Sequence, residues 1–214
     1  MTELIDLTHL FDDDMPVYPG DPCAKLYEIA SISKDGYTDH KIETGMHVGT
    51  HMDAPLHFIE GGMFISEVPL KSFTGIGHLV DAREKSSVTC ELLEMHDISK
   101  GDIVLVMTGC YKKFRDPDYY ETYPELSEDF ANRLVELGVS AVAMDTPSPD
   151  RDPFPVHRIL MSSDVLIIEN VDNLEALIGK GRFRVHAYPM KLHAEAAPVR
   201  IIAEIFCCQT QGAF

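Results

Sequence analysis

Residues 47–58, HVGTHMDAPLHF, contain four side chains that can bind a divalent metal ion. They are His47, His51, Asp53 and His57. Imidazole nitrogens and carboxylate oxygens suit zinc and its divalent neighbours. All four residues occupy odd positions, so an extended chain would direct their side chains to one face. A helix would turn Asp53 away from the first two histidines, and Pro55 would interrupt it. We therefore expect this segment to be extended or looped.

A straight strand, however, could not bring these side chains to one ion. The step from His47 to Asp53 would cover roughly 20 Å at about 3.3 Å per residue. The chain must therefore bend, and Gly49 can adopt the backbone conformations that a bend or bulge requires. The alternative is an ordinary strand edge with scattered histidines. Four aligned ligand-type residues make that the weaker interpretation.

Two more candidate ligands, His157 and Glu169, lie in the second half of the chain. Glu169 follows the apolar run 165–168, where a buried charge is unfavourable unless it is paired or bound to metal. Asp145, His157 and Glu169 all lie at or after the expected ends of strands, where ligands collect in open α/β sheets. Taken alone, Glu169 could simply reach solvent. The upstream cluster is what makes both residues metal candidates.

The composition is that of a soluble globular protein, with 214 residues, 45% hydrophobic and 25% charged. This length predicts a single domain over residues 1–214. The net charge of −17 argues against nucleic acid and anionic membranes as partners, because both would repel the chain. We find no signal peptide at the N-terminus, and no apolar stretch approaches the roughly 20 residues of a membrane span.

Five cysteines without a CxxC pair predict reduced, buried thiols in a cytoplasmic protein. The adjacent Cys207 and Cys208 could form a redox-active pair. Burial as small apolar side chains at a strand end is the interpretation we favour.

Hydrophobic patterns and turn signals predict strands alternating with helices, and hence a parallel sheet with helical crossovers. Helices are expected over 88–95 with Ser87 as N-cap, from Ser127 to Gly138, and over 154–162 with Pro155 in the first turn. The expected strands cover 3–10, 24–33, 38–46, 76–82, 103–107, 139–144, 165–168, 183–192 and 199–206. The front of the chain is therefore β-rich and its middle is βαβ-like.

A stiff loop near the N-terminus carries an exposed aromatic candidate. Residues 15–22, MPVYPGDP, hold three prolines and one glycine, which is typical of an ordered loop. Tyr18 in this loop could form a wall of a substrate site or could simply anchor the loop.

The segment HVGTHMDAPLHF resembles the signature HxGTHxDxPxH of the cyclase-type metal-dependent hydrolases, which include bacterial kynurenine formamidase (arylformamidase) and isatin hydrolase. Residues 16–21, residues 144–150, and His157 followed by 167–170 resemble further stretches of the same family. The resemblance runs through nearly the whole chain. It implies an α/β fold of the swivelling β/β/α type with a mixed sheet and helical crossovers, usually in a homodimer or higher oligomer.

The resemblance also implies roles for the candidate ligands. His47, His51 and Asp53 resemble the ligands of one metal. Asp53 and Glu169 resemble carboxylates that bridge to a second ion, of which His157 resembles a ligand. The ion implied is Zn²⁺, one or two per subunit, with Mn²⁺ as the alternative, since mixed histidine and carboxylate ligands suit both.

His57 resembles the family's proton donor and acceptor, not a ligand. Tyr18 lies where kynurenine formamidases place a tryptophan against the substrate ring. That departure, together with Asn170 after the glutamate, fits a general member of the family at least as well as a kynurenine formamidase.

These residues predict a metal-dependent amidohydrolase acting on a small-molecule amide. A divalent ion lowers the pKa of bound water from about 15.7 toward ~7 and polarises a carbonyl, while an unligated His57 could move a proton to the leaving amine. The resemblance to kynurenine formamidase implies, as the leading prediction, hydrolysis of N-formylkynurenine to kynurenine and formate, a step of tryptophan catabolism. One alternative opens a cyclic amide or lactone, as isatin hydrolase does. Another is a non-catalytic metal-binding protein.

Overall fold

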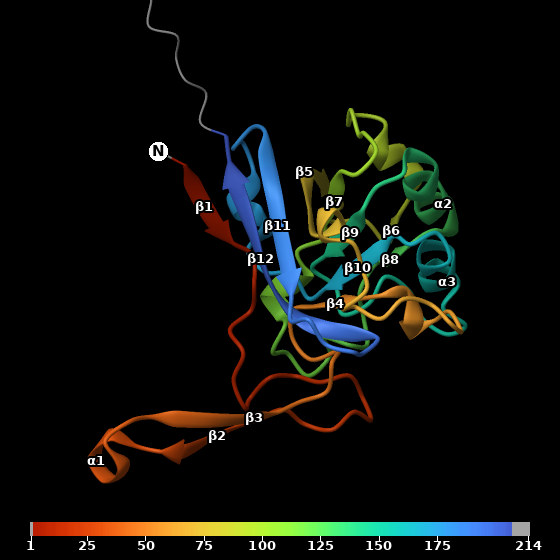
Figure 1. The fold of residues 1–214 in the computed structure, drawn as a ribbon. Helices are drawn as coiled ribbons and strands as arrows, with labels where there is room; N and C mark the ends of the chain where they lie inside the picture. Colours follow the sequence, from red (N-terminus) through yellow and green to blue (C-terminus); the bar gives the residue numbers. More distant parts are fainter. Residues whose placement is uncertain (1, 207–214) are drawn as a thin grey trace, which may run out of the picture.

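The computed structural model describes residues 2–206, which build one large mixed sheet with helices on its outer flank (Figure 1). The strand order is β1 (Glu3–Asp6), β12 (Ala196–Ile205), β11 (Phe183–Pro189), β5 (Thr74–Asp81), β7 (Ile103–Met107), β9 (Ala141–Met144), β10 (Leu166–Glu169) and β4 (His51–Asp53). Strand β4 also pairs with the start of β12, so the sheet closes on itself. The predicted α/β fold with a mixed sheet is confirmed.

The middle of the sheet is parallel, as the alternation of strands and helices predicts. Strands β5, β7, β9 and β10 run parallel, whereas β1, β4, β11 and β12 pair antiparallel with their neighbours. Along β7, Leu105 faces the core inside the closed sheet, and Val104 and Val106 face the core beneath α2 (Glu128–Leu137) and α3 (Pro155–Met161). Burial on both faces explains why this strand is continuously apolar.

Helices α2 and α3 form within one residue of their predicted bounds. The Ser127 hydroxyl accepts a hydrogen bond from the Phe130 amide, and Gly138 ends α2 in the left-handed conformation with φ +69°. Pro155 occupies the first turn of α3, where its missing N–H leaves no bond unmade. Helix α3 therefore begins two residues before His157 and turns that side chain inward, where it is buried.

The predicted helix over 88–95 is wrong, because Ser87 and Val88 form a short strand, β6, paired with β8 (Glu125–Leu126). The Ser127 amide and hydroxyl both donate to the Val88 carbonyl, which holds this segment extended. Only a 3₁₀ turn, η3 (Cys90–Leu93), follows it, after Thr89. The other 3₁₀ turns are η1 (Pro55–His57), η2 (Leu70–Phe73), η4 (Cys110–Lys113) and η5 (Leu174–Leu177).

A two-stranded arm projects from the body of the molecule (Figure 1). It consists of β2 (Lys25–Ala30), the single helical turn α1 (Ile32–Asp35) and β3 (Asp39–Glu43). The two strands were predicted on either side of a turn over 34–36, and Gly36 makes that turn with φ +80°. Strand β3 leads into the histidine-rich segment four residues later, at His47.

Some strand boundaries differ from the predicted ones. Strand β1 ends at Asp6, β11 ends at Pro189, and β12 already begins at Ala196. The last strand was expected to begin at Val199, yet Pro198 already pairs with His51. Among residues 2–206, no helix is long and apolar enough to cross a membrane.

The prediction of buried thiols is wrong for Cys23, which is exposed. Cys90 and Cys110 are half-buried, and all three are free thiols. Cys207 and Cys208 lie outside the described residues, so their two interpretations stay predictions.

Candidate metal centre

The chain bends sharply between His47 and β4, as the length of a straight strand required. Gly49 makes the bend with φ +68°, and a Cβ there would lie 2.3 Å from the Met15 side chain. Both observations explain the glycine. The bend folds His47 back over β4, so that its Nδ1 lies 3.0 Å from Oδ1 of Asp53.

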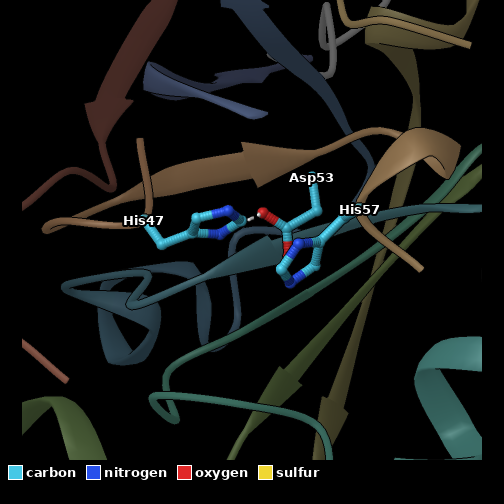
Figure 2. Close-up of side chains that lie close together, drawn as sticks. All are labelled: His47, Asp53 and His57. Carbon is cyan, nitrogen blue, oxygen red and sulfur yellow. Dashed lines mark ion pairs between the residues drawn. The ribbon is translucent and has the colours of Figure 1, made fainter. Parts of the chain in front are cut away.

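Two groups of candidate metal ligands meet at Asp53. In the first, the ligand atoms of His47, Asp53 and His57 lie within 4.8 Å of one another, and the two imidazole rings flank the carboxylate (Figure 2). In the second, the ligand atoms of His51, Asp53 and Glu169 also lie within 4.8 Å of one another. Asp53 alone belongs to both groups, which fits a carboxylate shared by two ions.

Strand pairing brings the distant Glu169 to this place. Strand β10 pairs antiparallel with β4, which sets Glu169 opposite His51. The Nε2 of His51 lies 3.3 Å from Glu169 Oε2, and the Nε2 of His157 lies 3.5 Å from Glu169 Oε1. Glu169 is 6% exposed, so the strand-end residue does not reach solvent. The structure thus brings together all six residues that were predicted to carry the chemistry.

The buried polar atoms at the centre fit a metal ion. Within residues 2–206, Nε2 of His51 and both carboxylate oxygens of Asp53 are buried without a hydrogen-bond partner. Such unpaired polar atoms are rare in protein interiors because leaving them unmet costs about 1–3 kcal/mol each, and more for a charge. A divalent cation would satisfy all three. The nitrogen and oxygen donors suit zinc or manganese.

Two candidate ligands are oriented by groups behind them. The Nδ1–H of His51 donates to the Gly49 carbonyl at 2.8 Å, which leaves Nε2 free to face the cluster. The Nδ1 of His157 lies 2.5 Å from Asp150 Oδ1, which fixes that ring in the same way. Asp150 also accepts the Val156 amide at the start of α3.

Our sequence reasoning missed the role of Asp150. The signal in the sequence was the carboxylate of Asp150, which precedes the short predicted helix that carries His157. A carboxylate in that position can accept the first helical amides, and the same contact places it next to the ligand.

The carboxylates strongly perturb two of the histidines. Burial by itself would lower the pKa of His47, but the negative charge of Asp53, supported by those of Glu169 and Glu195, outweighs it and raises that pKa to about 9. Burial likewise opposes a charged His157, and hydrogen bonds to Asp150 and Glu169 raise its pKa to about 9. Without a metal ion, these rings therefore supply the positive charge that balances the carboxylates.

His57 behaves differently from these two rings. Burial lowers its pKa below the ordinary histidine value, and the charges of His47 and His157 act in the same direction against the attraction of Asp53. The ring centre lies 4.2 Å from that of His47, with the two planes tilted by 33°, and the ring lies edge-on to Phe58 at 4.5 Å. Among residues 2–206, no side-chain hydrogen bond orients the His57 ring. A neutral, unrestrained imidazole can accept a proton, although the geometry also permits it to bind metal.

A pocket of about 330 Å³ opens onto the cluster. His47, His57, His157 and Glu169 form its polar floor. Its aromatic lining residues are Tyr18, Phe58, Tyr120 and Phe154. Tyr18 meets Tyr120 edge-on at 5.7 Å, so the stiff N-terminal loop does supply a wall of the pocket. The volume suits a ligand with one or two rings.

Two other polar residues support the site through hydrogen bonds to the surrounding loops. Asp145, which was considered as a functional residue, accepts hydrogen bonds from Thr108 and from the Gly109 amide, and so holds the loop after β7. The Asn170 side chain donates to the Gly49 carbonyl and accepts from Tyr119, which ties the end of β10 to the bend.

The chain is similar to known proteins over most of its length. Residues 5–151 match the family model described as "Putative cyclase". The kynurenine formamidase of Bacillus cereus is 26% identical over 207 residues, covering 94% of this chain and 97% of that protein. A solved structure described as a predicted metal-dependent hydrolase from Bacillus stearothermophilus superposes with a TM-score of 0.79 at 29% identity, covering 95% and 98% of the two chains.

Isatin hydrolase A from Labrenzia aggregata, bound to benzyl benzoate, has the same fold. Its TM-score is 0.86 at 24% identity, and the match covers 95% of this chain and 94% of that one. At this identity the likeness establishes shared architecture alone.

Proposed function

This chain belongs to the cyclase family of hydrolases, and on that premise we propose that it cleaves the C–N bond of a small aromatic amide with the help of a divalent metal ion. Family membership sets aside the alternative of a non-catalytic metal-binding protein. The observation that carries the proposal is the buried Asp53, whose two oxygens lack partners between two groups of candidate ligands.

The metal ligands we propose are His47, His51, Asp53, His157 and Glu169. When bound there, a divalent ion would activate water and polarise the substrate carbonyl. The sharing of Asp53 between both groups supports two ions, and the donor set favours zinc with manganese as the alternative. Elemental analysis of protein purified without added metal would give the identity and number of ions. A stoichiometry below one per chain would contradict the proposal.

We assign proton transfer to His57. Hydrolysis adds water across the amide, so the water must lose a proton and the departing amine must gain one. His57 lines the pocket beside the cluster, and its lowered pKa favours the neutral ring. Within the described part of the chain, no hydrogen bond orients that ring as one would orient a fixed ligand. It can therefore take the proton from water and deliver it to the nitrogen.

The substrate we propose first is an N-formyl aromatic amine such as N-formylkynurenine. Four aromatic side chains line the pocket, and Tyr18 lies at its entrance with 41% exposure, where it can contact a substrate ring. A second candidate is a cyclic amide such as isatin. It is favoured by the absence of Lys and Arg among the described lining residues, because a substrate carboxylate would find no Lys or Arg partner there.

Comparing kcat/KM for N-formylkynurenine and isatin with the zinc-loaded and manganese-loaded enzyme would separate these substrates. A preference of ten-fold or more for the formamide corresponds to about 1.4 kcal/mol and would support the first candidate. A preference for isatin would support the second. Failure to hydrolyse either substrate, or a panel of aryl amides and lactones, would contradict both.

We also propose that the protein self-associates through the β2–β3 arm. An isolated hairpin is marginally stable in water, and this one exposes six large apolar side chains. They are Leu26, Tyr27, Ile29, Ile32, Tyr37 and Ile42. Light scattering should show a homodimer or larger oligomer that the variant Ile42→Asp dissociates. The matched variant Met95→Asp changes a 90% exposed apolar residue of the body and should leave the mass unchanged.

A cytoplasmic location and a single domain over residues 1–214 complete the proposal. The free thiols of Cys23, Cys90 and Cys110 support a reducing compartment. Cell fractionation would test the location, and limited proteolysis that yields one resistant core would support the single domain.

A further inference from the structure

His47 lies between two carboxylates that face different nitrogens of its ring. Its Nδ1 lies 3.0 Å from Oδ1 of Asp53, on the side of the metal cluster. Its Nε2 lies 3.4 Å from Oε1 of Glu195, on the opposite side. Glu195 has no place among the candidate ligands, and it does not line the pocket.

The backbone of Glu195 is firmly fixed next to the cluster. Its carbonyl accepts the Ala54 amide at 2.8 Å, and the following residue, Ala196, pairs with Asp53 in the β12–β4 ladder. The side chain of Glu195 is 39% exposed, so its charge is not buried and needs no partner for its own sake. Its closeness to His47 therefore follows from strand register and not from an ion pair required by the core.

The other two histidine ligands show what this contact is for. His51 and His157 present Nε2 to the cluster, and each has an acceptor behind it on Nδ1: the Gly49 carbonyl and Asp150. His47 is turned the other way and presents Nδ1. It therefore requires its acceptor on Nε2, and Glu195 is the carboxylate at that nitrogen.

We propose that Glu195 is the positioning residue for His47, and this inference rests on the metal site of the proposed function. Glu195 accepts the Nε2–H, which keeps the proton on that nitrogen and leaves the lone pair of Nδ1 directed at the metal. An acceptor of this kind fixes the tautomer and the ring orientation, and raises the basicity of the ligand. Because Glu195 is half-exposed, its removal leaves neither a cavity nor an unpaired buried group.

The test is the affinity of the full-length protein for zinc, measured by competition with a chromophoric chelator. Loss of such a partner typically weakens binding by about 10–100-fold, which we expect for Glu195→Ala. Glu195→Gln should fall between the alanine variant and the parent, because an amide oxygen still accepts the hydrogen bond without the charge. Glu94→Ala, at an exposed glutamate directly after η3, should bind like the parent.

A second readout follows the ring itself. Nitrogen-15 shifts of the histidine side chains should show the Nε2–H tautomer of His47 in the zinc-loaded parent, and a mixture of tautomers in Glu195→Ala. A purely structural role would not change this signal, and the unfolding temperature should stay close to that of the parent.

The outcomes separate this inference from the function it rests on. If the parent protein binds neither zinc nor manganese, the proposed function fails. If the parent binds zinc but both Glu195 variants match its affinity within two-fold and keep the parent's tautomer, the metal site stands and the role of Glu195 is overturned. If the alanine variant does not fold, the glutamine variant and its nitrogen-15 spectrum decide the question.

Discussion

Two groups of histidines and carboxylates lie at opposite edges of the parallel strands, and only one has the properties of a metal site. At the edge where β7 begins, Nε2 of His78 lies 2.8 Å from Asp102, with His96 close by. At the edge where β10 ends, the nearest contact of Asp53 is longer, at 3.0 Å from His47. Closeness of a histidine to a carboxylate therefore does not distinguish the two groups.

What differs is whether the carboxylate already has its partners. Asp102 accepts hydrogen bonds from His78 and from the Ser99 amide, so it is satisfied by the protein. Asp53 is completely buried, and neither of its oxygens accepts a hydrogen bond within the described residues. Cavity size does not identify the metal site, because the pocket beside His78 measures about 770 Å³ and the pocket at the candidate metal site about 330 Å³. A cluster of unpaired buried polar atoms on candidate ligands is the better guide, since Nε2 of His9 is also buried without a partner among the described residues but His9 belongs to no such group.

The most severe test of this contrast is Asp53→Asn. The change removes the charge that both groups of ligands share, so metal binding and turnover should be lost together. The fall in kcat/KM should exceed the roughly 10²–10⁴-fold that acid/base help supplies. Zinc titration by calorimetry and a hydrolysis assay measure both effects. Retention of stoichiometric zinc with high affinity would show that the unmet oxygens of Asp53 do not mark the site.

Replacing His57 with alanine should separate metal binding from proton transfer. The variant should still bind metal, because the other candidate ligands remain. Turnover should fall by about 10²–10⁴-fold, since the proton path is lost. Zinc stoichiometry and single-turnover rates on the same sample give the answer. If zinc is lost as well, His57 is a ligand, as its place beside His47 and Asp53 also permits.

The local part of this site could be predicted from sequence, because its ligands are neighbours in the chain. His47, His51 and Asp53 lie within seven residues, and the length of a strand was enough to require the bend at Gly49. The contribution of Glu169 was harder to see. It depends on β10 pairing with β4, between residues more than a hundred positions apart, and no local pattern encodes that register.

The contacts that orient the ligands, and the short strand β6, could not be predicted from the sequence for a related reason. Asp150 reaches His157 through a loop whose path is set by tertiary packing, and Glu195 reaches His47 through the pairing of β12 with β4. The stretch over 88–95 has a helical pattern, yet hydrogen bonds from Ser127 hold its start extended. In each case a distant segment decides the local outcome.

A smaller effect is expected at Asp150, which supports a ligand without being one. Asp150→Asn keeps the shape but weakens the acceptor for His157, so zinc affinity should fall by about 10–100-fold. Chelator competition measures the change, and a normal circular dichroism spectrum is the control for folding. Unchanged affinity would mean that His157 contributes little to the metal site.

The pH dependence of stability should also separate the metal-free from the metal-loaded protein. The pKa values of His47 and His157 are raised to about 9 in the folded protein, from an ordinary value near 6.5. Their protonation therefore stabilises the metal-free protein fully below about pH 6.5, and this contribution disappears as pH rises through about 9. Metal ions bind the neutral rings, so zinc affinity should instead rise over the same range.

Unfolding temperatures with and without one equivalent of zinc, measured from pH 6 to pH 9, provide the test. The increment due to zinc should grow steadily with pH, mainly because the metal-free protein becomes less stable. A constant increment would mean that the two raised pKa values are not linked to metal binding.

The smallest effect is expected at Asp102, at the other edge of the parallel strands. Asp102→Ala removes the acceptor for His78 and for the Ser99 amide, so it should destabilise the fold by about 1–3 kcal/mol, as expected for partly buried hydrogen bonds. Chemical denaturation measures this loss, while zinc affinity and kcat/KM should match those of the parent. A large loss of zinc affinity or of kcat/KM would mean that a hydrogen-bonded histidine–carboxylate pair also serves the reaction. Unpaired buried polar atoms would then no longer distinguish the metal site from the other group.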